Sequence, residues 1–255
     1  MAMDTIGKSQ KKKNAVATVL MIILFTILAI LIVLPIYAIF MASFHPGNFL
    51  LQYGLNLDPD FAHMTLSNYV LLFTGDHDYW IWFGNSLILT VLTVVLTLLI
   101  SSFVAYGFAA YDFKGKNFFF VIVLIILSIP FEVIMLPLYK QISTWGLMDS
   151  YVAVVLPFLA HASTIFFFRQ YLLGLPKSLI EAGRIDGATE YGIFFKLIVP
   201  IMKPAFSAMA ILNGMNAWNN YMWPLLVIRS SSKYTLTIGL NTLINPYGDN
   251  YSLLV

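Results

Sequence analysis

Two titratable side chains, Glu132 and His161, lie within long apolar segments of the sequence. A charge at the centre of a bilayer costs about 2.5 to 3.5 kcal/mol, so something must compensate Glu132. Its carboxylate could face a polar pathway, act as a structural acid where the helix breaks at Pro130, or reach water at the outer surface. Because histidine titrates near neutral pH, His161 and Glu132 together could form a proton relay. His161 is also explained as a hydrogen-bonded packing residue.

A compact charged stretch, EAGRIDGATE, occupies residues 181–190 between two apolar segments. Ser178 and Glu181 have the spacing of a capping box, in which each side chain bonds a free amide of the first helical turn. A short helix is therefore predicted from Leu179 to about Asp186. An ordinary solvated loop, in which Glu181 only caps a helix, is the alternative interpretation.

Glycines give this stretch a specific shape. Gly187 is expected to end the short helix in a left-handed conformation, and Thr189 is expected to cap the next helix. Gly183 and Gly187 are four residues apart, so one side of the helix lacks side-chain bulk and would let another backbone approach. Charges surround this gap, which suits docking of a soluble partner: Glu181, Arg184, Asp186 and Glu190.

A third polar group combines amides with aromatic rings, in the run NAWNNYMWPLL at residues 216–226. Buried amides need partners inside a helical bundle, and amides beside rings also suit sugar hydroxyls and ring faces. Aromatic side chains at this depth commonly anchor a membrane interface, which is the favoured interpretation of Trp223. The residues concerned are Asn213, Asn216, Trp218, Asn219, Asn220, Tyr221 and Trp223.

Other chemistry finds no support in the sequence. The chain has no cysteine, which excludes disulfides, thiolate nucleophiles and thiolate metal sites, and no histidine spacing is typical of a metal site. No phosphate-binding loop is present, because the fragment GLPKS lacks the glycine-rich turn. The net charge of +2 argues against a nucleic-acid partner. No catalytic or metal-ligating residue is therefore predicted, and the chain is not expected to be an enzyme.

These residues must be held by membrane helices, because 60% of the sequence is hydrophobic and only 10% is charged. Each apolar run is long enough to span a bilayer and apolar on all sides. No internal repeat or linker divides the chain, so one all-α polytopic bundle is predicted for residues 1–255. Its five expected spanning segments are Ala15–Met41, Asn85–Ala110, Asn117–Lys140, Tyr151–Tyr171 and Lys196–Trp223.

Basic residues predict the orientation of these helices. They gather at the amino terminus, in the turn YDFKGKN, and from Arg169 to Lys203, so these parts are expected to face the cytoplasm. The loop at about 43–82 contains four aspartates and no Lys or Arg, as an external loop would. The segment at about 228–250 is expected to be external too, and the charged loop at about 172–195 cytoplasmic.

The stretch EAGRIDGATEYGIFFKLIVP resembles the EAA loop of binding-protein-dependent ABC importer permeases. That pattern is Glu-Ala-Ala, three residues, Gly, nine residues, Ile, one residue and Leu-Pro. Glu181, Ala182, Gly187 and Pro200 match it in register. Small or apolar replacements stand at Gly183, Leu197 and Val199. The runs NAWNNYMWPLL and KYTLTIGL further resemble the sugar-uptake branch, especially the smaller permease similar to the second permease of maltose transporters.

This resemblance implies a type I ABC importer permease in a prokaryotic cytoplasmic membrane, in contact with lipid, that carries a carbohydrate. It would form a heterodimer with a second permease, and two ATPase subunits would use ATP and Mg²⁺, so no cofactor is expected in this chain. The short helix would couple to the ATPase through Glu181, Ala182, Gly183, Arg184, Asp186, Gly187 and Glu190. Candidates for the translocation path are Glu132, Asn213, Asn216, Trp218, Asn219 and Asn220.

An extracytoplasmic sugar-binding protein is the remaining partner that the resemblance implies. Its candidate contacts are Tyr234, Asn245 and Tyr247, although a plain surface turn explains much of this composition. A sixth spanning helix is also expected, and YSLLV resembles its beginning. A proton-coupled secondary transporter using Glu132 and His161 is the rival hypothesis, and a membrane enzyme ranks third. Sugars, polyols and sugar phosphates all remain open as substrates.

Overall fold

The structure, a computed structural model, describes the backbone of residues 2–46, 61, 63–74 and 78–243, with side chains from Ala17 onward. All regular elements in these residues are helical, which confirms the all-α prediction. The chain divides into an N-terminal unit, Met1–His77 with Leu243–Val255, and a main unit, Asp78–Thr242. The expectation of one bundle formed by both units stays a prediction.

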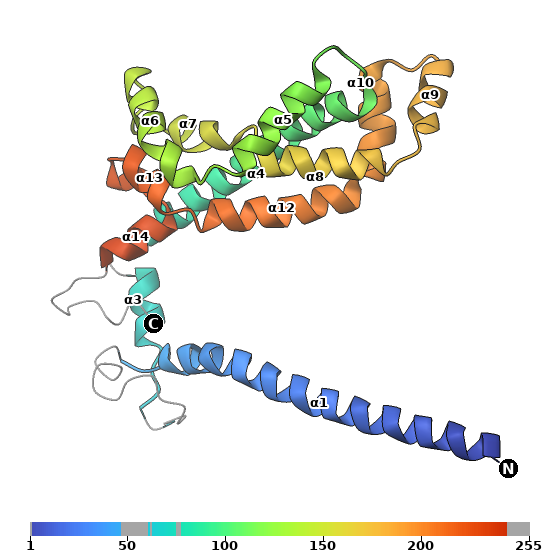
Figure 1. Cartoon of the computed structure of the whole chain (residues 1–255). Coiled ribbons are helices and arrows are strands. Elements are labelled where there is room, and N and C mark those ends of the chain that lie inside the picture. The colour runs from blue at the N-terminus through green and yellow to red at the C-terminus, as the bar shows by residue number, and fades with distance from the viewer. Residues whose placement is uncertain (1, 47–60, 62, 75–77, 244–255) are drawn as a thin grey trace. The chain divides into compact units, whose positions relative to one another are not determined.

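The N-terminal unit contains the long helix α1, Ala2–Ala42, in blue in Figure 1. Its part Ala17–Ala42 is long and apolar enough to cross a membrane, as predicted for the first segment. A second helix, α3 (Ser67–Thr74), lies in the predicted external loop and was not expected. The Asn68 amide donates to the carbonyl of Ser43 at 3.0 Å, and this long-range contact has no signal in a short sequence window.

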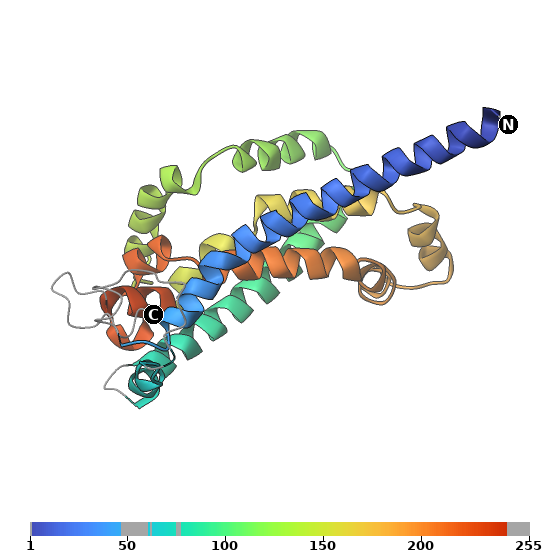
Figure 2. The same ribbon diagram turned by 90° about the horizontal axis from the view of Figure 1, so that it is seen from below.

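The main unit is built around α4 (Tyr79–Ala110), α8 (Ala162–Leu173) and α12 (Lys203–Trp218), which run side by side in Figures 1 and 2. Small side chains let membrane helices approach closely, and their hydroxyls can bond across the contact. One face of α4 supplies such residues, all of them buried: Thr93, Thr97, Ser101, Ser102 and Ala105. This stripe explains why α4 lies at the centre of the unit.

Three of the predicted spanning segments are broken rather than straight. α5 (Lys116–Leu127) and α6 (Phe131–Thr144) meet at 103°, so the prediction of one continuous helix over Asn117–Lys140 is wrong. Pro130 lacks an amide hydrogen and disfavours the helical conformation of the residue before it, which ends α5. The other two bends measure 42° and 77°. Among the described residues, two single helices are long and apolar enough to cross a membrane, or up to five segments if each bent pair counts as one.

Shorter elements complete the main unit, with α9 at one end and α6, α13 and α14 at the other (Figures 1 and 2). The last predicted span ends at Trp218 instead of Trp223, and the predicted loop at 228–250 contains α14. The short elements are α7 (Tyr151–Val155), η1 (Leu156–Phe158), α9 (Ser178–Ile185), α10 (Glu190–Gly192), the π-helical η2 (Ile193–Ile198), α11 (Val199–Ile201), α13 (Met222–Val227), η3 (Ser231–Lys233) and α14 (Leu236–Leu243).

Trp223 is fully buried, so its interpretation as a membrane-interface anchor is wrong. Its indole Nε1 donates to the carbonyl of Ala153 at 2.9 Å, and its ring meets that of Phe131 edge-on at 5.8 Å. The polar end of the indole therefore finds its partner inside the protein rather than in lipid headgroups. This contact ties α13 to α7 and α6.

We expect Gly239→Ala to destabilise the main unit. Gly239 lies in α14, and an added Cβ would overlap the buried indole ring of Trp82. Overpacking of this kind costs about 1 to 3 kcal/mol. Thermal unfolding of the purified chain in mild detergent should show a lower melting temperature. The control is Gly214→Ala, another helical glycine, whose Cβ would meet Val94 at an ordinary 3.8 Å; an equal loss in both variants would contradict the prediction.

Candidate functional site

The predicted short helix is present as α9, but it starts differently from the prediction. Ser178 is already helical, and no side chain caps the helix, so the capping box is wrong. Lys177 also has helical backbone angles, because the first amides of α9 bond carbonyls that precede the helix. The Leu179 amide donates to the Pro176 carbonyl at 3.1 Å, and the Ile180 amide donates to the Lys177 carbonyl at 3.0 Å. Glu181 is thus free of the capping role.

The end of α9 follows the prediction. Gly187 has a φ of 74°, its amide donates to Arg184 at 3.1 Å, and the next amide, of Ala188, donates to Gly183 at 3.0 Å. This pair of bonds is a Schellman motif, which needs the left-handed residue that glycine adopts without strain. Thr189 then caps α10 by accepting from the Gly192 amide at 3.1 Å. The turn between the two helices therefore has a defined conformation.

An ion pair closes this turn from the side. Arg184 Nε lies 2.6 Å from one Glu190 oxygen, and Nη2 lies 3.3 Å from the other. Tyr111, just after α4, donates its hydroxyl to the same carboxylate at 2.6 Å, and Tyr106 does so at 3.4 Å. The hydrogen bond to Glu190 raises the pKa of Arg184, while burial and then Glu190 raise the pKa of Tyr111. The tyrosine thus stays a donor at neutral pH.

Gly183 shows that the expected glycine gap does not face a partner. A Cβ there would lie 2.9 Å from Ile193 Cγ1 and 3.4 Å from Leu197 Cδ1, so the bare side of α9 packs on the protein's own η2. The docking interpretation of the gap is therefore wrong for Gly183, which is buried. The other residues predicted to couple α9 to a partner are exposed or half-buried: Glu181, Ala182, Arg184, Asp186, Gly187 and Glu190.

Two apolar side chains on this element were missed. Ile185 is 85% exposed at the end of α9, and Tyr191 is 71% exposed on α10. Large exposed apolar groups among charges are typical of contact surfaces. The sequence did contain a signal for the exposure of Ile185. It lies two residues after Gly183, so in a helix the two residues do not share a face. We call Ile185, Tyr191 and the exposed charges around them the α9 surface.

A cavity of about 200 Å³ lies between α4, α6, α7, η1, α12 and α13 of the main unit. Three of the predicted pathway residues line it, namely Asn213, Asn216 and Asn220, together with His161. α4 adds the hydroxyl-bearing side chains Ser86, Thr93 and Thr97. The wall thus combines amides and hydroxyls with the rings of Phe131 and Phe158, a lining that can bond a polar, ring-shaped solute.

The other predicted pathway residues do not line this cavity. Trp218 packs edge-on against Phe83 at 5.7 Å, and Asn219 donates to the Met215 carbonyl at 2.8 Å. Glu132 is exposed in the first turn of α6, where a carboxylate is favoured by the helix dipole. No side chain caps the start of α6, so the structure does not show Glu132 capping the helix at the Pro130 break. His161 faces the cavity without Glu132, so the structure does not assemble the proton relay.

Asn213 illustrates how the cavity wall is held. Its amide nitrogen donates to Thr164 Oγ1 of α8 at 3.1 Å and to the Met209 carbonyl at 2.9 Å. Thr97 of α4 donates to the Phe158 carbonyl at 2.8 Å, where η1 would otherwise leave it unpaired. Both groups line the cavity while bonded, so their orientation is fixed before any solute enters.

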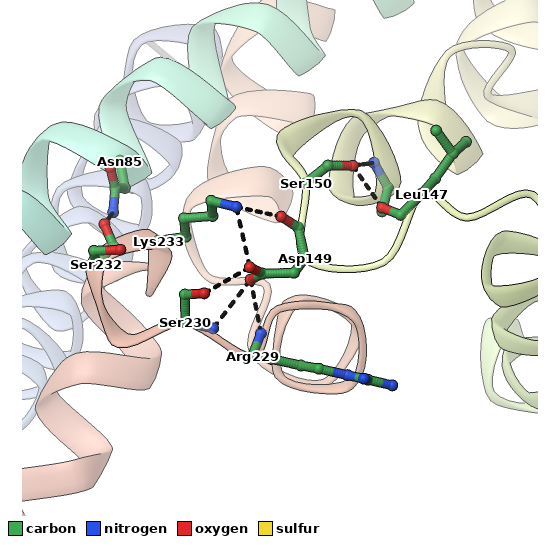
Figure 3. A network of polar contacts seen from close by, with 9 residues as sticks. Asn85, Leu147, Asp149, Ser150, Arg229, Ser230, Ser232 and Lys233 are labelled. Carbon is green, nitrogen blue, oxygen red and sulfur yellow. Dashed lines mark hydrogen bonds and ion pairs between the residues drawn. The ribbon is translucent and has the colours of Figure 1, made fainter.

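A second polar cluster, absent from the sequence predictions, lies at the α13 end (Figure 3). Asp149 has a φ of 57° and accepts from the amides of Arg229 and Ser230 at 3.0 Å each, from Ser230 Oγ at 2.6 Å and from Lys233 Nζ at 3.0 Å. The Ser230 hydroxyl and these further donors hold the pKa of Asp149 well below its usual range. The cluster fixes the segment between α13 and α14.

The predicted binding-protein contacts lie next to this cluster or outside the described residues. Tyr234 is half-buried, and its carbonyl accepts from the Asn85 amide at 2.9 Å. Its ring packs against the core around α7, so it is not a freely exposed side chain. Asn245 and Tyr247 lie outside the described residues, as does the expected sixth helix.

Apolar helices, a polar cavity between them and an exposed helix–turn–helix at one end define a polytopic membrane permease. The sequence matches the family of binding-protein-dependent transport system inner membrane components over residues 98–255, and the chain belongs to that family. This finding confirms the resemblance on which the EAA-loop prediction rests.

Two named relatives align with more than 90% of this chain. It is 50% identical over 246 residues to the arabinooligosaccharides transport system permease protein AraQ of Halalkalibacterium halodurans, covering 96% of this chain and 88% of that protein. It is 51% identical over 231 residues to AraQ of Bacillus subtilis, covering 91% and 82%. The structure is also similar to a chain in the crystal structure of a bacterial ABC transporter involved in the import of the acidic polysaccharide alginate. The TM-score is 0.81 at 23% sequence identity, and the match covers 95% of this chain and 89% of that chain, which shows a shared fold.

We expect Asp149→Asn to lower the melting temperature by a few degrees at neutral pH, because the amide accepts from Lys233 and Ser230 more weakly than the carboxylate. Asparagine tolerates a positive φ, so the backbone is preserved. The carboxylate's pKa is depressed in the folded chain, so its contribution is present above the unfolded value of about 3.9 and is lost as pH falls through the folded pKa. Melting curves of both proteins should therefore converge below about pH 4.

The matched control is Asp186→Asn, an exposed aspartate whose carboxylate makes no hydrogen bond within the described residues. That variant should melt with the parent across the same pH series. A constant gap between Asp149→Asn and the parent down to acidic pH would mean that ionisation of Asp149 does not carry the effect.

Proposed function

We propose that this chain is a permease subunit of an ATP-driven importer and that it carries a carbohydrate across a prokaryotic cytoplasmic membrane. The observation that carries the proposal is the α9 surface, an exposed apolar and charged patch on a helix whose two ends are held by the Schellman turn and the Arg184–Glu190 pair. A rigid, exposed element at one end of a membrane bundle is suited to receive force from a soluble partner.

The proposed partners follow from the family, whose description names a binding-protein-dependent system. A second permease completes a heterodimer, two ATPase subunits bind ATP and Mg²⁺, and a sugar-binding protein delivers substrate from outside. In this assignment the chain itself catalyses no reaction. The α9 end and the amino terminus lie in the cytoplasm, in agreement with the basic residues around them.

Contacts in the main unit give a route from α9 to the cavity. Gly183 of α9 packs on Ile193 of η2, and η2 continues through α11 into α12 after a 77° bend. α12 carries Asn213 and Asn216, which line the cavity. If closure of the ATPase dimer moves α9, the packed elements η2 and α12 would shift with it about the bend, and the cavity wall would move.

The substrate class rests on the two AraQ relatives, which are named for arabino-oligosaccharides. The cavity agrees with a sugar, because amide and hydroxyl groups bond its hydroxyls and the rings of Phe131 and Phe158 suit its apolar faces. Its volume of about 200 Å³ limits it to a small part of an oligosaccharide at one time. We therefore assign arabinose-containing oligosaccharides as the transported solutes.

Deleting the gene in its host should reduce uptake of labelled arabino-oligosaccharides at least tenfold, and expressing the chain again should restore it. Uptake should stop when cellular ATP is depleted while the proton gradient is maintained. The measurement is initial-rate uptake with maltose and glycerol 3-phosphate as comparison solutes. Uptake that survives ATP depletion and follows an imposed pH gradient would instead support the proton-coupled rival.

Ile185→Asp should separate the permease from its ATPase. A buried apolar contact at the centre of an interface is often worth 2 kcal/mol or more, so co-purification of the ATPase in mild detergent should fall by about tenfold or more. The melting temperature of the isolated chain should not change, because Ile185 is 85% exposed. Ile185→Leu serves as the control and should still co-purify with the ATPase. Full co-purification of the ATPase with Ile185→Asp would show that Ile185 of α9 does not take part in the contact.

A further inference from the structure

The turn between α4 and α5 forms one side of a cleft of about 450 Å³, and Arg169 of α8 forms part of the other. Two cations line this cleft, Lys116 and Arg169, against a single carboxylate, Asp112. Neither cation belongs to the α9 surface or to the cavity between the helices. The cleft therefore carries a net positive charge that the transport mechanism described above does not use.

Arg169 is incompletely paired within the described residues. Its guanidinium lies 3.8 Å above the Phe120 ring, and its Nε atom is buried without a hydrogen-bond acceptor. No described carboxylate lies within ion-pair distance of it. A buried donor left unpaired is unfavourable, and more so when the group is charged. Arg169, one turn before the end of α8, therefore brings to the cleft a positive charge that no described carboxylate neutralises.

Lys116 and the start of α5 supply further donors to the cleft. The Lys116 ammonium bonds the Tyr111 carbonyl at 2.7 Å and Asp112 at 3.0 Å, which leaves one of its three N–H groups. Gly115 precedes the helix with φ of 85° and has no side chain to cap it. The amides of Asn117 and Phe118 consequently have no acceptor among the described residues. Helix amides, an ammonium and a guanidinium together match a phosphate group.

We propose that this cleft binds a phosphate group, supplied by the headgroup of an anionic phospholipid or by a free phosphate ion. Apolar side chains beside the cleft favour the lipid, because Phe118 and Phe119 are 66% and 52% exposed next to the cationic groups. Lys116 also lowers the pKa of Asp112, so the carboxylate stays ionised and keeps its bond to the ammonium. The site is independent of which solute the permease transports.

The test compares the full-length chain, purified with the subunits that accompany it, in two lipid environments. Nanodiscs of phosphatidylcholine are prepared with and without phosphatidylglycerol, and a third sample contains inorganic phosphate in phosphatidylcholine alone. Native mass spectrometry counts retained phosphatidylglycerol, and thermal unfolding measures stabilisation by each probe. The variants are Arg169→Gln and Lys116→Gln. Arg229→Gln is the control, since its side chain points away from the Asp149 cluster at the other end of the unit (Figure 3).

We expect phosphatidylglycerol to bind about tenfold more weakly to Arg169→Gln and Lys116→Gln than to the parent, which is what loss of one charge-assisted hydrogen bond implies. Arg229→Gln should bind as the parent does. If inorganic phosphate alone stabilises the parent but not Arg169→Gln, the site stands and its ligand is the free ion. Equal binding of both probes by the parent and both variants would overturn the proposal. If Arg169→Gln does not fold, the binding of phosphatidylglycerol to Lys116→Gln, a substitution in the surface turn, tests the proposal.

Discussion

The close approach of α4 to α8 and α12 is the contact on which the other features of the main unit depend. Thr97 and Ala105 lie on the face of α4 where bulkier side chains would force the helices apart. In lipid, packing and interhelical bonds must replace the hydrophobic driving force that assembles soluble bundles. The same hydroxyl face bonds the Phe158 carbonyl and lines the cavity, so one set of small polar residues both assembles the helices and leaves room between them.

The breaks in three of the spanning segments also depend on internal polar partners. A helix that ends inside a bundle exposes backbone carbonyls and amides, and in a membrane each of these needs a partner within the protein. Trp223 meets the Ala153 carbonyl, and Thr97 meets that of Phe158. At the break between η1 and α8, other helices thus supply the donors. The separate break before α12 is a bend of 77° between η2 and the residues that line the cavity.

Features that depend on adjacent residues could be predicted from the sequence, whereas contacts between residues far apart in the sequence could not. The end of α9 at Gly187 and the Thr189 cap depend on a few adjacent residues, and both were predicted correctly. Composition likewise predicted five apolar segments. The burial of Trp223 and the bonds of Asp149 depend on partners some 70 to 80 residues away, which no short window contains. Gly183 was recognised as a close-approach site, but its neighbour, Ile193, could be identified only once the turn had brought η2 against α9.

Arg184 and Arg169 show how the role of an arginine depends on whether a carboxylate pairs with it. Arg184 bonds both oxygens of Glu190 through two of its five N–H groups, so its charge is paired and it holds a turn. Arg169 has a ring face and a buried, unbonded Nε, so its site is electrostatically incomplete. Tyr111 contacts both neighbourhoods, since its hydroxyl bonds Glu190 and its carbonyl accepts from Lys116. The cleft and the α9 turn therefore share Tyr111, through its carbonyl on one side and its hydroxyl on the other.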